Sequence, residues 1–505
     1  MPTFHLDGNQ LTLTQVRAVV FDGATVEIFA ASRAAMQASR AVIEKVIASG
    51  ATVYGVNTGF GKLARERIST DQIRDLQVNL VRSHCVGVGD SLTESEVRAM
   101  ILLRANALAK GLSGVRPAVV EALCAMLNAG VHPVIPAKGS VGASGDLAPL
   151  AHLAAVVIGE GHAVYKGERL SGAEAMRRAG IAPVALEAKE GLSLLNGTQG
   201  MLALLSLALL EAETLIDTAD VATSLSLDAL KGTPAAFDPR IAQARPYAGH
   251  ARTARNIERL NADSEIRESH RAAAVDPRVQ DAYSLRCSPQ VHGAVRDALA
   301  HIRATVEVEL NSATDNPLVF AETGEVISGG NFHGQPLAMA ADELAVALAT
   351  LAGISERRID QMTNPGTSLL PAFLTEHAGL HSGFMMAQVT AAALASENKA
   401  LAMPHSVDSI PTSGNQEDYV SMGMSAARRL RPMLDNTRNT LAIELLCACQ
   451  GIDLLAPLKT GLEARKAYAL VRAAVPRLDD DRTLAPDIAS ASDIIASGAL
   501  ATILR

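Results

Sequence analysis

The stretch of this sequence with the most unusual residue types is glycine-rich, spans residues 138–152 and reads KGSVGASGDLAPLAH. One interpretation is a turn that enters a helix, where free backbone N–H groups could hold an anion. The stretch is not a Walker loop, because no Gly-Lys-Ser/Thr follows. It is not a nucleophile elbow either, because Asp146 replaces the last glycine of Gly-x-Ser-x-Gly.

A second hypothesis is a self-processing triplet, Ala143-Ser144-Gly145. The N–H of Gly145 could attack the carbonyl of Ala143 if the backbone folded back tightly, which small side chains permit. Loss of water from that ring and from the Ser144 hydroxyl would leave a methylidene-imidazolone. That group is an electrophile, and no ordinary side chain supplies one, so many enzymes use a cofactor for this purpose.

The elements that must position this stretch are predicted to be helices. Hydrophobic residues make up 48% of the 505 residues, but aromatic residues only 3% and tryptophan none, so the core must consist of Ala, Leu, Val and Ile. Such a composition suits close-packed helices. Helical spacing of apolar residues is found over residues 22–47, 93–112, 115–128, 201–230, 291–312, 336–359, 382–402 and 425–455.

The later helices carry few charges over many turns, so they need apolar neighbours on most sides, as in a bundle. Two short hairpins are predicted, one around Lys166-Gly167 and one around Thr323-Gly324. We therefore expect a mainly α fold with two domains. Residues 1–200 would form a smaller mixed region that carries the Ala-Ser-Gly loop, and residues 201–505 a long antiparallel helical bundle.

Charge and cysteine content exclude several classes of protein. The net charge of −8 argues against a nucleic-acid partner. No basic segment followed by an apolar stretch opens the chain, and the longest apolar run, 201–210, is too short to span a bilayer. The five cysteines read as reduced thiols of a cytoplasmic protein. His377 and His381 lack the glutamate of a zinc motif, so we predict no metal site.

Seven blocks in one order along nearly the whole chain resemble a known family. Residues 138–152 resemble the signature of the aromatic amino-acid ammonia-lyases. The other blocks are YGVNTGFG at 54–61, NLVRSH at 79–84, LNGTQ at 195–199, QDAYSLRC at 280–287, GGNFH at 329–333 and NQED at 415–418.

The resemblance implies that the methylidene-imidazolone forms autocatalytically from Ala143-Ser144-Gly145 and that no external cofactor is needed. The electrophile would capture the substrate, by its amine or by its ring, and turn the amino group into a leaving group. Tyr54, alone or with Tyr283, would be the base at the β-carbon, with a pKa lowered by the site. Asp146 would assist the cyclisation.

Further residues take binding roles by the same resemblance. Arg286 would hold the substrate carboxylate, because a guanidinium fork matches two oxygens. Asn196, Gln280 and Tyr283 would hydrogen-bond the prosthetic group and the amino-acid end of the substrate. Phe332 would form a wall beside the prosthetic group.

Two positions are predicted to select the substrate. In the family, Ser-His at the position of Ser83-His84 is usual in the histidine branch, whereas His-Leu goes with tyrosine and Phe-Leu with phenylalanine. Glu417 is also the histidine-branch form, and an imidazole and a carboxylate can together bind two ring nitrogens. We therefore expect conversion of L-histidine to trans-urocanate. Cys85-Val86 and residues 271–278 depart from the branch pattern, which leaves tyrosine and phenylalanine open.

The resemblance also implies a homotetramer whose active sites combine residues from three chains, with a small amino acid as substrate and neither a membrane nor a nucleic acid as partner. Two other classes are open: a helical scaffold that has lost the chemistry, and a phosphate-binding protein that uses the loop at 139–145. Single residues also have plainer interpretations. Glu417 and Asp418 would be first-turn charges behind a Ser413/Gln416 capping box, and Arg286 a salt-bridge partner.

Overall fold

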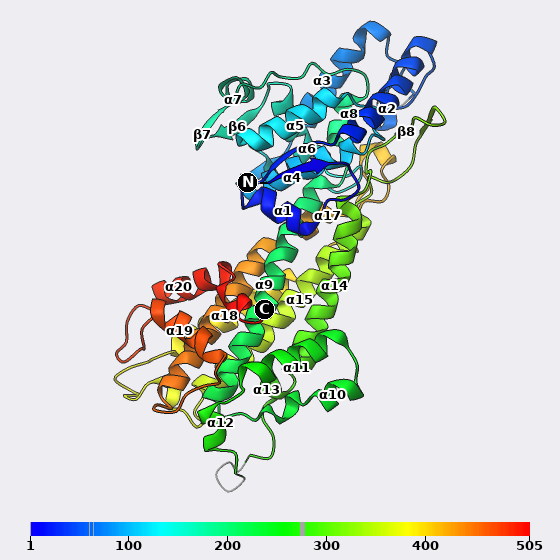
Figure 1. Cartoon of the computed structure of the whole chain (residues 1–505). Coiled ribbons are helices and arrows are strands. Elements are labelled where there is room, and N and C mark those ends of the chain that lie inside the picture. Colours follow the sequence, from blue (N-terminus) through cyan, green and yellow to red (C-terminus); the bar gives the residue numbers. More distant parts are fainter. Residues whose placement is uncertain (1, 60, 64, 273–277) are drawn as a thin grey trace. The chain divides into compact units, whose positions relative to one another are not determined.

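The computed structural model describes residues 2–59, 61–63, 65–272 and 278–505 of the chain. The fold is mainly helical, as the composition predicts, and its strands are short (Figure 1). Most of the departing stretch at 271–278 lies outside the described residues.

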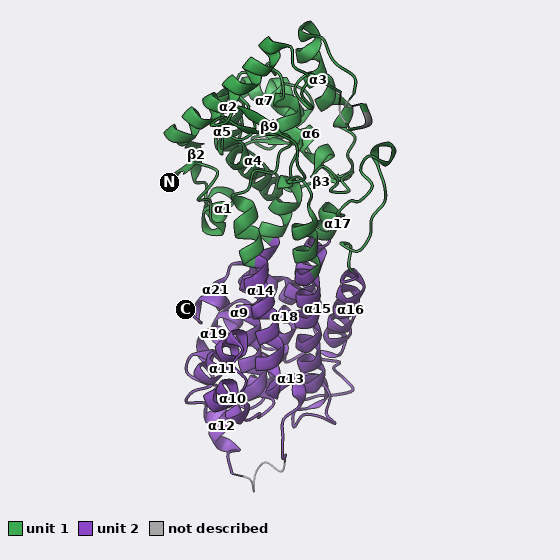
Figure 2. Ribbon diagram, turned by 90° about the vertical axis from the view of Figure 1, so that its right-hand side faces the viewer, with its two compact units in different colours: residues 1–207, 303–342, 404–428 green, residues 208–302, 343–403, 429–505 purple. Residues whose placement is uncertain are grey.

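The described residues form two compact units (Figure 2). Unit 1 comprises residues 1–207, 303–342 and 404–428, and unit 2 comprises residues 208–302, 343–403 and 429–505. These units are not the continuous domains 1–200 and 201–505 that we expected. Residues 303–342 and 404–428 pack with the N-terminal part, which sequence order alone does not indicate.

Unit 1 contains all the strands of the described residues, together with helices. Its strands are β1 (Thr3–Leu6), β2 (Thr25–Ile28), β3 (Val88–Ser91), β4 (Val131–Pro133), β5 (Pro136–Lys138), β6 (His162–Tyr165), β7 (Glu168–Ser171), β8 (Leu318–Phe320) and β9 (Glu325–Ile327). Its helices are α1 (Leu13–Val20), α2 (Ala30–Ser49), α3 (Ile73–His84), α4 (Glu94–Ala109), α5 (Pro117–Ala129), α6 (Leu147–Val157), α7 (Gly172–Arg178), α8 (Glu190–Leu195) and α17 (Gly423–Arg428).

Unit 2 consists of helices, among which α18 packs against α16 and α20. These are α10 (Pro239–Ala244), α11 (Ala248–Leu260), α12 (Glu265–Ser269), α13 (Tyr283–Arg286), α16 (Met385–Leu401), α18 (Leu430–Asp453), α19 (Ala464–Ala474), α20 (Ala485–Ala496) and α21 (Ala499–Thr502). The division between the units falls within three long helices, α9 (Gln199–Ala229), α14 (Ser288–Leu310) and α15 (Gln335–Thr363).

Both predicted hairpins are confirmed, as β6–β7 and β8–β9. The helix predicted over 22–47 is wrong at its start, because Thr25–Ile28 forms a strand that pairs in parallel with Thr3–Leu6. Val26 and Ile28 are buried while Glu27 between them is exposed, and this period of two is that of a strand. The helix predicted over 425–455 is divided into α17 and α18.

Helices α9 and α15 are long and apolar enough to cross a bilayer by length and composition, although the continuous apolar run at 201–210 is short. Their most apolar windows are 72% and 61% buried inside the fold. That degree of burial is typical of core helices, whose apolar surface is covered by neighbouring elements.

Candidate active site

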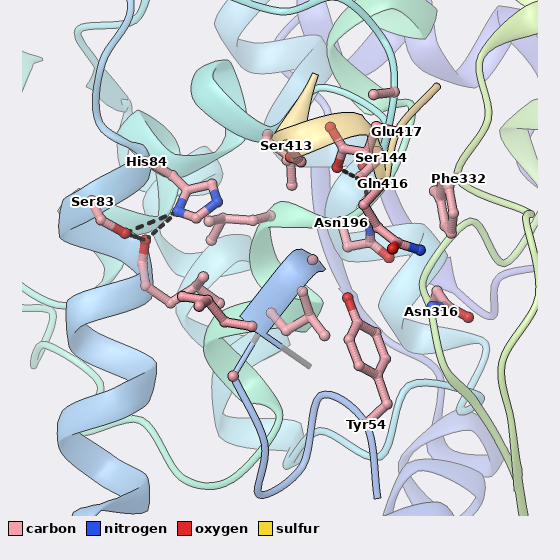
Figure 3. A pocket seen from close by; sticks show the side chains of 18 of the residues that line it. Tyr54, Ser83, His84, Ser144, Asn196, Asn316, Phe332, Ser413, Gln416 and Glu417 are labelled. Carbon is pink, nitrogen blue, oxygen red and sulfur yellow. Dashed lines mark hydrogen bonds between the residues drawn. The ribbon is translucent and has the colours of Figure 1, made fainter. Parts of the chain in front are cut away.

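A cavity of about 880 Å³ in unit 1 brings several predicted site residues together (Figure 3). A volume of this size is suited to a small organic ligand. The predicted residues that line it are Tyr54, His84, Ala143, Ser144, Asn196, Phe332 and Glu417. Helix α3, the loop before α6, the turn after α8 and the segment 413–419 therefore contribute to one site.

The Ala143-Ser144-Gly145 triplet lies between β5 and α6, and its C-terminal side is fixed by the turn after α8. The Asp146 N–H donates to the carbonyl of Gly197 at 2.7 Å. Asn196 Nδ2 donates to the carbonyl of Ser144 at 2.9 Å. Gly145 has φ +73°, and a Cβ there would overlap the carbonyl of Gly197. Only glycine allows this close approach of the two chain segments.

The N-terminal side of the triplet is fixed by residues 421 and 422. The Met422 N–H donates to the carbonyl of Val141 at 2.8 Å, and Ser421 Oγ donates to the carbonyl of Gly142 at 3.1 Å. Gly142 has φ +69°, and a Cβ there would overlap Ser421 Oγ. Both sides of the triplet are thus held by backbone contacts that leave no room for larger residues.

Asp146 lies directly behind the triplet and is fully buried. Its carboxylate accepts hydrogen bonds from Ser140 Oγ at 2.9 Å and from the Met201 N–H at 2.7 Å. Burial raises the pKa of Asp146 to about 6, although these donors and the backbone of Gly200 lower it. Near neutral pH, this carboxyl group can therefore exchange a proton beside the triplet.

The residues around the triplet fit a methylidene-imidazolone. Asn196 Oδ1 is buried and has no hydrogen-bond partner among the described residues, so it leaves an acceptor for a bound group. Ser144 is half-buried and lines the cavity, which allows its hydroxyl to leave as water. Phe332 lines the same cavity (Figure 3).

Glu417 is fixed beside Ser144 by a tight loop. Its Oε1 accepts a hydrogen bond from Ser144 Oγ at 3.0 Å, and its Oε2 accepts one from Thr412 Oγ1 at 2.7 Å. Ser413, Gly414 and Asn415 all have positive φ, and the backbones of Thr412 and Glu417 pair across them. Glu417 is therefore not in the first turn of a helix, so the capping-box interpretation is wrong.

His84 lies at the C-terminal end of α3, across the cavity from Ser144 and Glu417 (Figure 3). Its Nδ1 lies 2.8 Å from the carbonyl of Leu80 and 3.1 Å from Ser83 Oγ. A carbonyl can only accept, so Nδ1 carries a proton and Nε2 is the acceptor of the neutral ring. Ser83 Oγ lies beside this protonated nitrogen and can accept from it.

Tyr54 lines the cavity, but its acidity differs from our expectation. Burial raises the pKa of the Tyr54 phenol, a hydrogen bond with the Gly61 backbone lowers it, and the charges of Glu417 and Asp315 raise it further. The net direction is upward, whereas we predicted a pKa lowered by the site. Within one chain, burial and these two carboxylates therefore disfavour the phenolate form of Tyr54.

Gln280, Tyr283 and Arg286 belong to unit 2, and none of them is among the described residues that line the cavity. Tyr283 and Arg286 form the ends of α13, and the Arg286 guanidinium lies 4.4 Å from the centre of the Tyr283 ring. Arg286 Nε donates to the carbonyl of Asp281 at 3.0 Å. Tyr283 is 70% exposed, so this pair is open to a partner.

Sequence reasoning missed the residues that hold the site from behind. Thr412 fixes Glu417, and Ser421 fixes Gly142. Arg104 of α4 donates from the interior to Ser193 in α8 and to Gln199 at the start of α9, on either side of the turn. An arginine inside an apolar helix was a signal that could have found the last of these, because a buried charge needs a specific partner.

Comparison with known proteins identifies the family of the chain. The model of the aromatic amino acid lyase family matches residues 11–473. The chain is 58% identical over 518 residues to histidine ammonia-lyase of Koribacter versatilis, and the match covers 100% of both chains.

Two solved structures are also similar to the chain. The crystal structure of histidine ammonia-lyase from Trypanosoma cruzi has a TM-score of 0.92 and 43% identity, covering 100% of this chain and 95% of that one. Tyrosine aminomutase from Streptomyces globisporus has a TM-score of 0.94 and 40% identity, covering 100% and 98%. The chain belongs to the aromatic amino acid lyase family.

Proposed function

We propose that this protein is a cytoplasmic lyase that eliminates ammonia from L-histidine to give trans-urocanate. The observation that carries the proposal is that His84 and Glu417 line the same cavity as Ala143 and Ser144. Full-length relatives of the histidine branch support the choice of histidine. All five cysteines are free thiols, in keeping with a reducing compartment.

The ring of histidine suits the two polar groups of the cavity. The protonated substrate ring carries two N–H groups, so His84 Nε2 would accept from one and the Glu417 carboxylate from the other. The phenylalanine ring carries no polar hydrogen and the tyrosine ring only one O–H, so neither could donate to both of these half-buried acceptors. A site of this kind rejects an apolar analogue strongly.

The methylidene-imidazolone would supply the electrophile that makes the substrate's amino group a leaving group. Ala143, Ser144 and Gly145 would form it without an external cofactor, assisted by the Asp146 carboxyl group. Asn196 would hold it through its hydrogen bond at the Ser144 carbonyl. Phe332 would exclude water from one side.

The remaining groups would come from other copies of the chain, in a homotetramer with shared active sites. Tyr54 would remove the β-proton, and Arg286 of another chain would bind the substrate carboxylate, with Gln280 and Tyr283 beside it. This arrangement would also explain how Tyr54 can act as a base although burial raises its pKa within one chain. An arginine brought close to the phenol lowers its pKa and offsets the effects of burial and of Glu417.

The first experiment measures the mass of the purified, folded chain and ammonia release from three amino acids. We expect a deficit of two water molecules localised to residues 143–145, and turnover of histidine but not of tyrosine or phenylalanine. An unmodified mass would contradict formation of the electrophile and would favour a helical scaffold without the chemistry. A modified chain that turns over tyrosine but not histidine would contradict only the proposal that histidine is the substrate.

The pH dependence of kcat tests the role of Tyr54. Since the phenolate is the basic form, kcat should rise with pH up to the pKa of Tyr54 in the assembled site. An Arg286→Lys variant keeps the charge but places it less well, so the rise should move to higher pH. We would measure kcat at saturating histidine in both proteins, and an unchanged profile would refute the effect of Arg286 on Tyr54.

A further inference from the structure

A fully buried arginine lies beneath the turn that holds the triplet. Arg104, on α4, has 0% exposure. Its Nη1 donates to Gln199 Oε1 at 2.6 Å, and its Nη2 donates to the carbonyl of Ser193. Burial lowers the pKa of Arg104 to about 10, so it stays charged at neutral pH. Burying a charge is costly, and these polar partners offset the cost only while they are held in place.

Two further side chains complete a platform under the turn. Gln199 Nε2 donates to Thr314 Oγ1 at 2.8 Å. A Cβ placed on Gly197 would overlap Arg104 Nη1, Gln199 Oε1 and Thr314 Oγ1 alike. The backbone at Gly197 therefore rests directly on these three residues, which we call the Arg104 platform.

The turn on the platform is the same one that fixes the triplet. Its Gly197 carbonyl accepts from the Asp146 N–H at 2.7 Å, and its Asn196 Nδ2 donates to the Ser144 carbonyl at 2.9 Å. Arg104 itself does not line the cavity and makes no hydrogen bond with the triplet among the described residues. Arg104 therefore acts on the triplet indirectly, through the segment that it holds, which includes Asn196 and Gly197.

We propose that Arg104 is a positioning residue for formation of the prosthetic group. This inference rests on the proposed function. The platform holds Asn196 and Gly197 so that the Gly145 nitrogen stays close to the Ala143 carbonyl carbon. An intramolecular reaction of this kind depends steeply on geometry, and a misplacement of about 1 Å costs about 100-fold in rate.

Formation of the prosthetic group from Ala143, Ser144 and Gly145 removes two water molecules from the chain. A bond forms between the Gly145 nitrogen and the Ala143 carbonyl carbon, and the bond from that carbon to the Ser144 nitrogen becomes double. The carbonyl oxygen leaves as water with the N–H protons of Gly145 and Ser144. The Ser144 Cα–H bond then breaks and its electron pair forms the Cα=Cβ bond. The Cβ–Oγ bond breaks, and the hydroxyl leaves with the Cα proton as the second water.

The test compares two arginines on the same helix. Arg104→Met removes the charge and the fork, and Arg104→Lys keeps the charge alone. Arg98→Met is the matched control, because Arg98 of α4 also donates to backbone carbonyls, those of Val19 and Val20, away from the triplet. Thr314→Val removes only the hydroxyl that accepts from Gln199 and should leave the fold intact.

The readout is the fraction of folded chain that has lost two waters, followed by intact mass at intervals after synthesis is stopped, with the unfolding temperature measured in parallel. We expect water loss to slow about 100-fold in Arg104→Met and less in Arg104→Lys and Thr314→Val. Arg98→Met should lower the unfolding temperature without slowing water loss.

Normal water loss in folded Arg104→Met or, if that variant does not fold, in Thr314→Val would overturn the role of Arg104 while leaving the proposed function intact. Equal slowing in Arg98→Met would also overturn it, because the effect would then be general loss of stability. An unprocessed natural chain would overturn the proposed function and this inference together.

Discussion

A Glu417→Gln chain should lose histidine turnover by about 100- to 1,000-fold, the usual loss when one preorganised polar group is removed from an active site. The amide keeps the size of the side chain and can still accept from Ser144 or Thr412 through one oxygen. It loses the negative charge and one acceptor, and both are needed to bind a ring N–H of the substrate. The loss should therefore appear in kcat/KM for histidine.

Asp418→Asn is the matched control for this variant, because Asp418 is the neighbouring carboxylate and lines the same cavity. Asp418→Asn removes the same amount of charge from the cavity and keeps the hydrogen bond between Ser144 and Glu417. We expect the Asp418 variant to keep most of its turnover and both variants to unfold at a similar temperature. Full turnover in Glu417→Gln, or an equal loss in Asp418→Asn, would show that Glu417 does not bind the substrate ring.

The fold was predictable where one physical signal dominates. The helical spacing over 93–112 predicts α4, and Thr93 and Glu96 form the capping box that starts it. The prediction failed over 25–28, where a short strand precedes a helix and the apolar residues satisfy both periods. It also failed for the units, because the return of residues 303–342 and 404–428 to unit 1 depends on long-range packing.

The site was predictable where whole blocks of sequence resemble a family. The cavity contains Tyr54, His84, Ser144, Asn196 and Glu417, which come from separate blocks. Position in a sequence does not show which atoms are desolvated, so the sequence did not indicate that burial raises the pKa of Tyr54 within one chain.

The residues that hold Glu417 in place were harder to predict from the sequence. The hydrogen bond from Thr412 to Glu417 requires three consecutive residues of positive φ, at 413–415. Only one of these is glycine, so residue type alone did not indicate the loop.

Two inactive variants should restore activity to each other if the active sites are shared between chains. Ser144→Ala cannot form the prosthetic group, and Arg286→Met cannot bind the substrate carboxylate. In co-expressed tetramers, a site whose triplet comes from an Arg286→Met chain and whose arginine comes from a Ser144→Ala chain is intact. Random assembly makes about a quarter of the sites intact, so we expect about a quarter of the natural activity.

The control pairs Ser144→Ala with Tyr54→Phe. Ser144 and Tyr54 line the cavity of one unit 1, so every site in these hybrids carries one of the two defects. This pair should stay inactive, whereas the Ser144→Ala and Arg286→Met pair recovers. Recovery in neither pair would mean that Arg286 acts on the site of its own chain. Recovery in the Ser144→Ala and Arg286→Met pair alone would place Arg286 in the active site of another chain, where its charge would lower the pKa of the Tyr54 phenol.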